Sequence, residues 1–197
     1  MEEEIKLPEQ KTQGGASLTL ALAQRRSVRE FSDRDLTLAE IGQILWAAQA
    51  ITDSIEGFRT APSAGALYPL EIYVVNKDGQ FHYRPKDHTL VQNGNEDVRQ
   101  KLTRAALDQM FVEEAPCVFV ITAIYERTIG KYGERGVRYV HMEAGHLAQN
   151  ILLQAVALGL GGVPVGAFYD REVAQILKLN EMEKPLYLIP VGEPRIR

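Results

Sequence analysis

Three arginines and a serine cluster near the start of the chain, in a protein whose formal net charge is −4. They are Arg25, Arg26, Ser27 and Arg29. A guanidinium group carries a fixed charge on a planar set of donors and suits phosphate oxygens better than an ammonium group does. Arg25 and Arg29 are four residues apart, so they share a face if the local backbone is helical. Two interpretations remain open: an anion or cofactor site, or a solvated basic helix end that complements the helix dipole.

Two stretches of small residues would let the backbone approach a flat ligand closely. The first is the loop 57–69, which contains Pro-Ser-Ala-Gly at 62–65. The second is Gly-Leu-Gly-Gly-Val-Pro-Val-Gly at 159–166. This second run is not a dinucleotide-binding fingerprint, because Pro164 stands where the third glycine is required and the run follows a helix instead of a strand. We interpret it as a loop whose amides face the edge of a ligand.

Lys131 and Tyr132 are the candidates for acid–base chemistry. A lysine whose pKa is lowered by burial can act as a base. The alternative is a lysine and an aromatic residue at a helix end with no chemical role. The histidines do not suggest a metal site, because His141 and His146 are five residues apart and diverge by roughly 140° on a helix. The single cysteine, Cys117, lies in an apolar run and is interpreted as a buried small hydrophobe.

Length and composition indicate one domain covering residues 1–197. The acidic balance argues against broad nucleic-acid binding and gives no basic surface for a membrane. The first residues are acidic and lack the regions of a signal peptide, so we expect a cytoplasmic protein. Residues 151–169 carry no charge over the length of a membrane span, but glycines and Pro164 would break a helix there. We expect a buried helix followed by a tight loop.

The order of helices and a few separated strands predicts an α+β domain with helices packed on one mixed sheet. Residues 1–16 are expected to form an extended arm. Helices are expected from Ser17 toward Arg25, from Thr37 as N-cap, over 97–110, over 139–158, and over 170–179 with Asp170 as cap. Strands are expected over 71–75, 80–84, 117–122 and 185–191.

The motifs together resemble the nitroreductase-like flavoprotein family, and within it the SagB-type (thiazole-oxidase-like) dehydrogenase branch. Five stretches carry the resemblance: 25–31, 62–69, 131–136, 143–150 and 166–170. Any one of them is a weak signal, whereas all five in the same order are a strong one. The resemblance extends from about Leu7 to the C-terminus.

The resemblance implies a nitroreductase-like fold, with a central mostly antiparallel sheet flanked by helices, in an intertwined homodimer that binds FMN at the subunit interface. Carried over by position, the phosphate, ribityl chain and pyrimidine edge are held by Arg25, Arg26, Ser27 and Arg29. The partner subunit contributes Pro62, Ser63, Ala64, Gly65 and Leu67. The isoalloxazine ring is lined by Val163, Pro164, Val165 and Gly166, and Arg195 returns to the phosphate.

The function that the resemblance implies is hydride transfer between NADH or NADPH, or a small organic substrate, and flavin N5 by a ping-pong route. A second expectation is oxidation of azolines to azoles in peptides, because Lys131 and Tyr132 match a Lys-Tyr pair used for proton abstraction in such oxidases. Those oxidases have larger chains and work beside a peptide-modifying complex. A third expectation is a non-catalytic flavin carrier.

Overall fold

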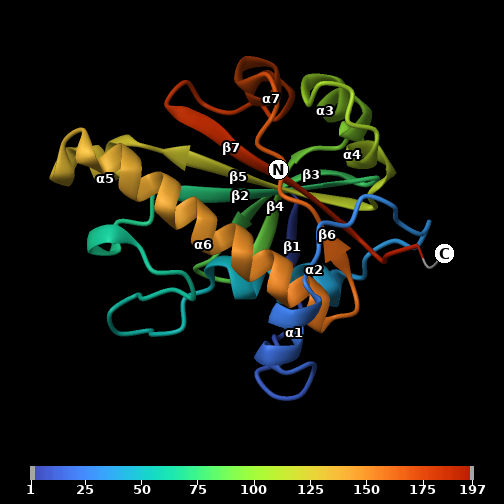
Figure 1. Ribbon diagram of the computed structural model, residues 1–197. Coiled ribbons are helices and arrows are strands. Elements are labelled where there is room, and N and C mark those ends of the chain that lie inside the picture. Colours follow the sequence, from blue (N-terminus) through green and yellow to red (C-terminus); the bar gives the residue numbers. More distant parts are fainter. Residues whose placement is uncertain (1–2, 196–197) are drawn as a thin grey trace.

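A seven-stranded antiparallel sheet forms the centre of the molecule (Figure 1). The computed structural model describes residues 3–195, and within them the strand order is β1-β4-β3-β2-β5-β7-β6. Every neighbouring pair of strands is antiparallel. The strands are β1 Glu4–Lys6, β2 Leu70–Asn76, β3 Gly79–Arg84, β4 Thr89–Gly94, β5 Cys117–Ile124, β6 Gly161–Gly162 and β7 Glu183–Gly192. The predicted α+β class with an antiparallel sheet is confirmed.

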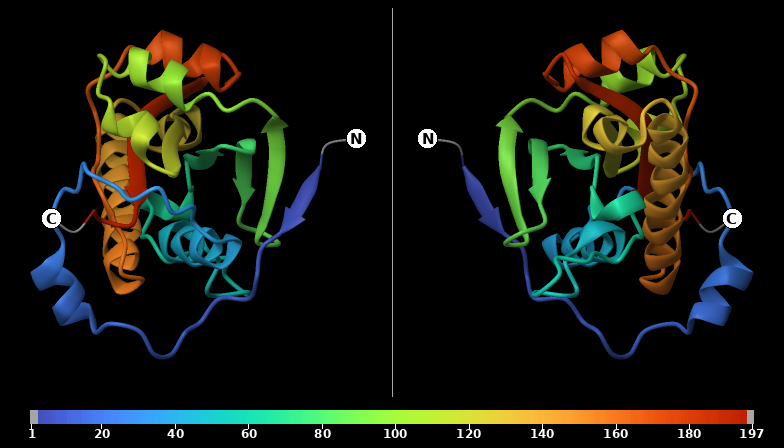
Figure 2. Two further views of the ribbon diagram at one scale, coloured as in Figure 1. Left: turned by 90° about the vertical axis from the view of Figure 1, so that its right-hand side faces the viewer. Right: turned by 90° about the vertical axis from the view of Figure 1, so that its left-hand side faces the viewer.

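Helices cover both faces of this sheet. They are α1 Leu18–Gln24, α2 Leu38–Gln49, α3 Arg99–Ala105, α4 Phe111–Glu114, α5 Glu126–Tyr132, α6 Arg135–Ala157 and α7 Asp170–Ile176, with a 3₁₀ turn η1 at Ala64–Ala66. The long helix α6 crosses one face together with α2, while α3 and α7 lie on the other (Figures 1 and 2). No helix of the described chain is long and apolar enough to cross a membrane.

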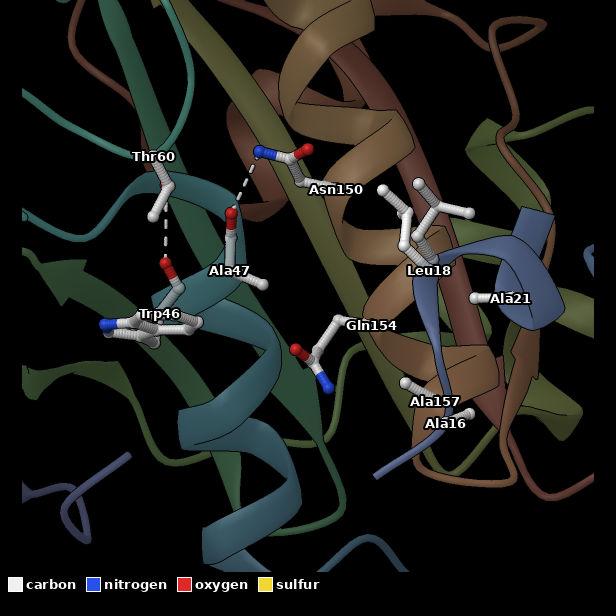
Figure 3. A pocket seen from close by; sticks show the side chains of 10 residues that line it. Ala16, Leu18, Ala21, Trp46, Ala47, Thr60, Asn150, Gln154 and Ala157 are labelled. Atoms are coloured by element: carbon white, nitrogen blue, oxygen red, sulfur yellow. Dashed lines mark hydrogen bonds between the residues drawn. The ribbon is translucent and has the colours of Figure 1, made fainter. Parts of the chain in front are cut away.

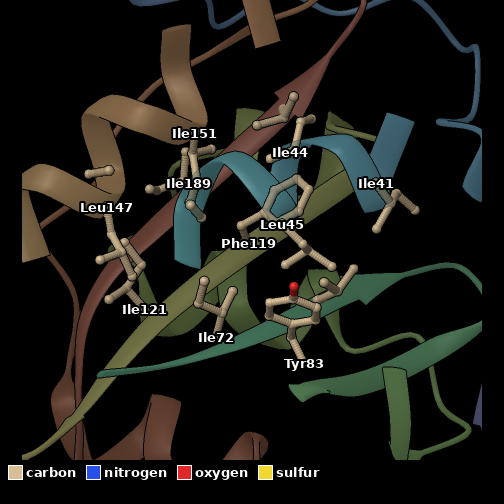
Figure 4. Packing of buried hydrophobic residues seen from close by; sticks show 14 of the residues in the cluster. Ile41, Ile44, Leu45, Ile72, Tyr83, Phe119, Ile121, Leu147, Ile151 and Ile189 are labelled. Atoms are coloured by element: carbon tan, nitrogen blue, oxygen red, sulfur yellow. The ribbon is translucent and has the colours of Figure 1, made fainter. Parts of the chain in front are cut away.

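Strand β5 is buried on both faces because its β-branched and aromatic residues supply two cores. On the first face, Phe119 and Ile121 pack with α2 and α6. Figure 4 shows this cluster, with Ile41, Ile44, Leu45, Ile72, Tyr83, Phe119, Ile121, Leu147, Ile151 and Ile189. On the second face, Val118 and Val120 pack with residues of α3 and α7. The predicted central strand is confirmed, and it fixes the position of α6 against the sheet.

Local capping places α2 as expected. The Thr37 side chain accepts a hydrogen bond from the Glu40 N–H at 3.2 Å, and the Glu40 carboxylate accepts one from the Thr37 N–H at 2.7 Å. This reciprocal capping box satisfies two backbone donors that the first helical turn leaves free. The predicted cap at Asp170 is wrong, because Tyr169 is the N-cap residue of α7 and makes no side-chain capping bond.

Three further elements differ from what the sequence predicted. The helix expected over 97–110 ends at Ala105, because Leu107 and Asp108 have φ values of 60° and 56° that a right-handed helix cannot contain. The extended arm contains strand β1, which pairs with the unpredicted strand β4 through the partners Ile5 and Leu90. Helix α6 also begins at Arg135, earlier than the predicted start at 139.

Candidate functional site

The arginine-rich segment is extended, and it is bonded to two distant parts of the chain. The Val28 N–H donates to the Gly162 carbonyl at 3.1 Å, and the Arg195 N–H donates to the Glu30 carbonyl at 3.0 Å. Residues 27–31 therefore run between β6 and the end of β7, where the C-terminal segment lies beside them (Figure 2). Helix α1 ends before Arg25, whose ψ is 120°. Arg25 and Arg29 consequently do not share a helical face. Arg25 is the C-cap residue of α1, and Arg26 donates to carbonyls at the same helix end, so these two arginines do lie at a helix end, whereas Arg29 lies beyond it.

The arginine segment lies so close to β6 that position 161 must be glycine. A Cβ atom at Gly161 would lie 2.5 Å from Val28 Cγ2, well inside van der Waals contact. Val28 thus fills the space that a side chain at 161 would occupy, and the arginine segment can lie directly against the sheet. This packing brings four of the predicted site positions, Arg25, Ser27, Arg29 and Arg195, to one corner of the fold.

Of the guanidinium groups in this corner, Arg195 lies 3.8 Å from the Asp33 carboxylate, whereas those of the 25–29 segment have no ion-pair partner among the described residues. Within residues 3–195, none of the ion pairs includes Arg25, Arg26 or Arg29. Arg26 donates to the backbone carbonyls of Ala23 and Arg25 at 3.2 Å and 2.7 Å, and the Arg29 guanidinium lies 5.6 Å from the Phe111 ring centroid. Uncompensated guanidinium donors at the surface fit a phosphate monoester.

The segment 163–166 continues the corner with its side chains inward. Val163 and Val165 are buried, and their N–H groups donate to β7 carbonyls at 3.2 Å and 2.8 Å. Pro164 is half-buried, whereas Gly166 is exposed. Within the described chain, the Gly166 N–H donates no hydrogen bond. A free amide beside small residues matches the donor that the edge of a flat heteroaromatic ring needs. The residues present therefore fit the phosphate and the ring of FMN.

The loop carrying Pro62–Gly65 and Leu67 lies elsewhere in the same chain. His146 Nδ1 is 3.4 Å from the Pro62 carbonyl oxygen, so the loop packs on the N-terminal half of α6. Gly162 instead packs near Leu152, toward the other end of that helix. The loop also lines a hollow with Glu143, and positions 143 and 152 are about 14 Å apart along the helix axis. One chain thus places the two predicted sets of cofactor residues at different ends of α6 (Figure 1).

The predicted acid–base pair meets this loop at Gly65. A Cβ atom at Gly65 would lie 2.8 Å from Tyr132 Oη and 2.9 Å from Lys131 Nζ. Tyr132 is held in turn by an edge contact with Tyr139, with ring centroids 5.2 Å apart. Lys131 is exposed in the single chain, so this chain does not supply the burial that was expected for a lysine base. The two side chains converge on a point of the loop that is itself exposed.

Glu143 is a candidate that the sequence analysis missed. Its side chain is on α6 with only 2% of the residue exposed, and its Oε1 has no hydrogen-bond partner among residues 3–195. Burial raises the pKa of Glu143 to about 7, against the opposing effects of a hydrogen bond from Ser63 and the charge of Arg59. Val140, Glu143 and Leu147 occupy one buried stripe of α6. A carboxylate in an apolar helical stripe is the signal that identifies it.

A different hollow lies between α1, α2 and α6 (Figure 3). Its volume is about 290 Å³, and its lining includes Leu18, Trp46, Asn150 and Gln154. Asn150 donates to the Ala47 carbonyl at 3.0 Å, which ties α6 to α2 at the base of the hollow. None of its lining side chains is ionisable. This hollow therefore offers packing surface but no acid or base.

Comparison with known proteins identifies the class. The model of the family described as "Nitroreductase family" matches residues 22–193. The chain belongs to the nitroreductase family and is an oxidoreductase with the nitroreductase fold.

Individual relatives agree with this assignment. The chain is 54% identical over 177 residues to a nitroreductase homologue of Methanocaldococcus jannaschii, covering 87% of this chain and 88% of that protein. It is 26% identical over 165 residues to the microcin B17-processing protein McbC of Escherichia coli, covering 77% of this chain and 60% of that protein. A crystal structure of a nitroreductase homologue from Ralstonia eutropha matches with a TM-score of 0.89 and 31% identity, covering 98% and 90% of the two chains.

The first prediction concerns Gly65, whose φ of +64° lies in the left-handed region. Gly65→Ala adds a Cβ against Lys131 and Tyr132 in a conformation that alanine resists, and should lower the free energy of unfolding by about 1–2 kcal/mol. Gly130→Ala, on α5 with open space around its Cβ, should instead raise it by roughly 0.5–1 kcal/mol. Urea titration of both variants measures this. Equal effects would contradict the crowding at Gly65.

The second prediction concerns the pH dependence of stability. Because the folded pKa of Glu143 is raised from 4.5 to about 7, the folded state holds more protons than the unfolded state between these values. The contribution of Glu143 is therefore most favourable below about pH 4.5, decreases as the pH rises to about 7, and is constant above it. Glu143→Gln should remove this decrease in the free energy of unfolding, which is at most about 3 kcal/mol.

The comparison is the difference in unfolding free energy between wild type and Glu143→Gln, measured by urea titration from pH 4.5 to 8. Other carboxylates titrate in both proteins and cancel in the difference. A difference that does not change with pH would show that Glu143 is ionised throughout.

Proposed function

We propose that the protein is a homodimeric, FMN-dependent oxidoreductase that accepts hydride from NADH or NADPH, or from an organic substrate. The observation that carries this proposal is that the segment with Arg25 and Arg29, neither of them in an ion pair among residues 3–195, lies between Gly162 and Arg195, with the free Gly166 amide four residues beyond Gly162. The nitroreductase family generally binds FMN. Bound FMN would take up two electrons and a proton from one substrate and pass them to the next.

Different residues are proposed to bind different parts of FMN. Arg25, Arg26 and Arg29 supply guanidinium donors for the phosphate, and Ser27 supplies a hydroxyl beside them. Arg29 also adds positive charge, which favours the reduced, more negative flavin. Because Val163 and Val165 are buried, the 163–166 segment would present its backbone, Pro164 and the Gly166 amide to the ring, so a flat ligand can lie against it.

The second half of the site is proposed to come from a second copy of the chain. The Pro62–Leu67 loop borders Glu143, about 14 Å along α6 from the position of Leu152 beside the arginine corner, so the two halves are separated within one chain. Helix α1, next to that corner, exposes Leu18, Leu20 and Leu22 at 66%, 44% and 54%. An apolar helix surface of this kind is typical of a subunit interface. Dimerisation would cover α1 and bring the loop to the partner's cofactor.

A second candidate function is oxidation of azolines to azoles, as in the SagB-type branch. It is favoured by the convergence of Lys131 and Tyr132 on Gly65 and by the similarity to the microcin B17-processing protein. In this reaction Lys131 would remove a proton from the ring carbon, and the flavin would be the two-electron acceptor for the hydride that leaves the substrate. This chain spans about 60% of that relative, so its peptide-modifying role is not carried over as a whole.

The third prediction tests the cofactor site. Arg25→Ala combined with Arg29→Ala should weaken FMN binding on the order of 100-fold, since each charge-assisted hydrogen bond contributes roughly 1.5–3 kcal/mol. The matched control is Arg84→Ala on β3, whose guanidinium pairs with Glu4 and Asp87 at the opposite edge of the sheet. The measurement is flavin absorbance of the purified protein and fluorescence titration with FMN. Undiminished flavin in the double variant would contradict the proposed site.

The fourth prediction separates the candidate reactions. Lys131→Ala should reduce turnover of an azoline peptide on the order of 100-fold if Lys131 is the base, while anaerobic bleaching of the flavin by NADH or NADPH stays within about twofold because no protein base takes part in it. Full azoline turnover in this variant would remove that role. Flavin that binds but is reduced by neither nicotinamide nor azoline would identify a carrier.

A further inference from the structure

A cavity of about 600 Å³ lies beside the strained loop that follows Phe58. Its walls include Phe58, Arg59, Pro62, Ser63, Gly65 and Tyr68. This size suits a small organic molecule. The cavity shares no residue with the arginine corner. Pro62, Ser63 and Gly65 belong to the loop proposed to reach the cofactor of the partner subunit, so in the proposed dimer the cavity lies next to that cofactor. It also borders Gly65, the point where Lys131 and Tyr132 meet the loop.

Arg59 is the only lysine or arginine in this wall. Its guanidinium stacks on Tyr68, 4.4 Å from the ring centroid, and its backbone N–H donates to Tyr68 Oη at 3.1 Å. The Nε is buried without a hydrogen-bond partner, and no ion pair among residues 3–195 includes Arg59. An arginine side chain remains protonated in proteins, so Arg59 carries a permanent positive charge and has hydrogen-bond donors that are not used.

The nearby carboxylates do not neutralise Arg59 by contact. Glu71 is already paired, with Arg127 at 2.6 Å and with His82 at 2.8 Å. Glu143 acts on Arg59 through space, and its own pKa is raised toward neutrality by burial. An anion that enters the cavity would therefore meet a guanidinium free to bind it.

The loop holds this arrangement before any ligand arrives. The Tyr68 N–H donates to Ser63 Oγ at 2.9 Å, which closes the loop over Gly65. Ala66 and Tyr68 have φ values of 54° and 46°, conformations that non-glycine residues adopt only under strain. Strain of this kind is stored where the surrounding contacts fix the backbone. Tyr68 is thereby fixed as a flat platform under Arg59, with exposed Phe58 nearby.

We propose that this cavity is the substrate pocket and that Arg59 makes it selective for planar organic substrates carrying a carboxylate. The proposal rests on the proposed function and specifies its substrate class. The aromatic walls take the planar body, the Arg59 guanidinium takes the carboxylate, and the other end of the molecule lies toward Gly65, Lys131 and Tyr132. For a nitroaromatic carboxylate, Ar–NO₂, NAD(P)H and H⁺ give Ar–NO, NAD(P)⁺ and water. Two electrons come from the nicotinamide, and one N–O bond breaks.

The test uses the FMN-loaded protein with two probes, 4-nitrobenzoate and 4-nitrobenzamide, which share the ring and the nitro group and differ in charge. Arg59→Gln should raise the KM for 4-nitrobenzoate about tenfold, the loss expected for one charge-assisted hydrogen bond, and change that for 4-nitrobenzamide less than twofold. Arg59→Lys, which keeps the charge, should recover part of the selectivity. Equal changes for both probes would overturn the proposal. Loss of FMN from Arg59→Gln would also overturn it, by making Arg59 a cofactor ligand.

Two measurements on the wild-type protein keep the proposal testable if the variants do not fold. Raising the ionic strength should increase the KM for 4-nitrobenzoate and leave that for 4-nitrobenzamide unchanged. Binding of each probe to the oxidised protein, followed by NMR line broadening without turnover, should favour 4-nitrobenzoate. A protein that binds 4-nitrobenzoate selectively but holds no reducible flavin would refute the proposed function and not the pocket. Reducible flavin without this selectivity would refute the pocket alone.

Discussion

The arrangement of the site depends on how residues 27–32 are bonded between β6 and the end of β7. Backbone hydrogen bonds from Val28 to Gly162 and from Arg195 to Glu30 fix this short extended segment on both sides. Because Gly161 has no side chain, Val28 can pack where a Cβ would otherwise lie. These contacts turn a surface peptide rich in arginine into a rigid edge. They also explain why the final residues of the chain take part in the same corner as residues near its start.

Helix α6 separates the two parts of the site. Its buried stripe packs on α2 and the sheet, so its length sets a fixed distance between the arginine corner and the 62–67 loop. The strong core contacts along it, from Val140 to Ala155, leave little freedom to close that distance within one chain. This separation is why the proposed cofactor site draws its two parts from two copies of the chain. The exposed leucines of α1 lie next to the part that a second copy would have to cover.

Two ionisable side chains beside the 62–68 loop have polar atoms without a hydrogen-bond partner among the described residues. Arg59 lies over Tyr68 with an unused donor, and Glu143 is buried with an unused acceptor. Ser63 links the two groups. Its hydroxyl accepts a hydrogen bond from the N–H of Tyr68, on which Arg59 stacks, and it donates one to Glu143. Desolvated and partly unpaired groups cost stability. Their concentration beside a strained loop is the pattern expected where a protein binds a ligand.

The sequence by itself determined the family and much of the local structure. The Thr37–Glu40 capping box, the doubly buried β5 and the order of five short motifs all depend on neighbouring residues, and each was confirmed as a structural or family assignment. Strand β4 was missed because its pairing partners, and not its own composition, make it a strand. Only the tertiary structure showed that the arginine segment is extended, and that Arg59, Ser63 and Glu143 meet around one loop. Residue periodicity encodes which face of an element is buried, whereas contacts between residues 80 or more positions apart are decided by how whole elements pack.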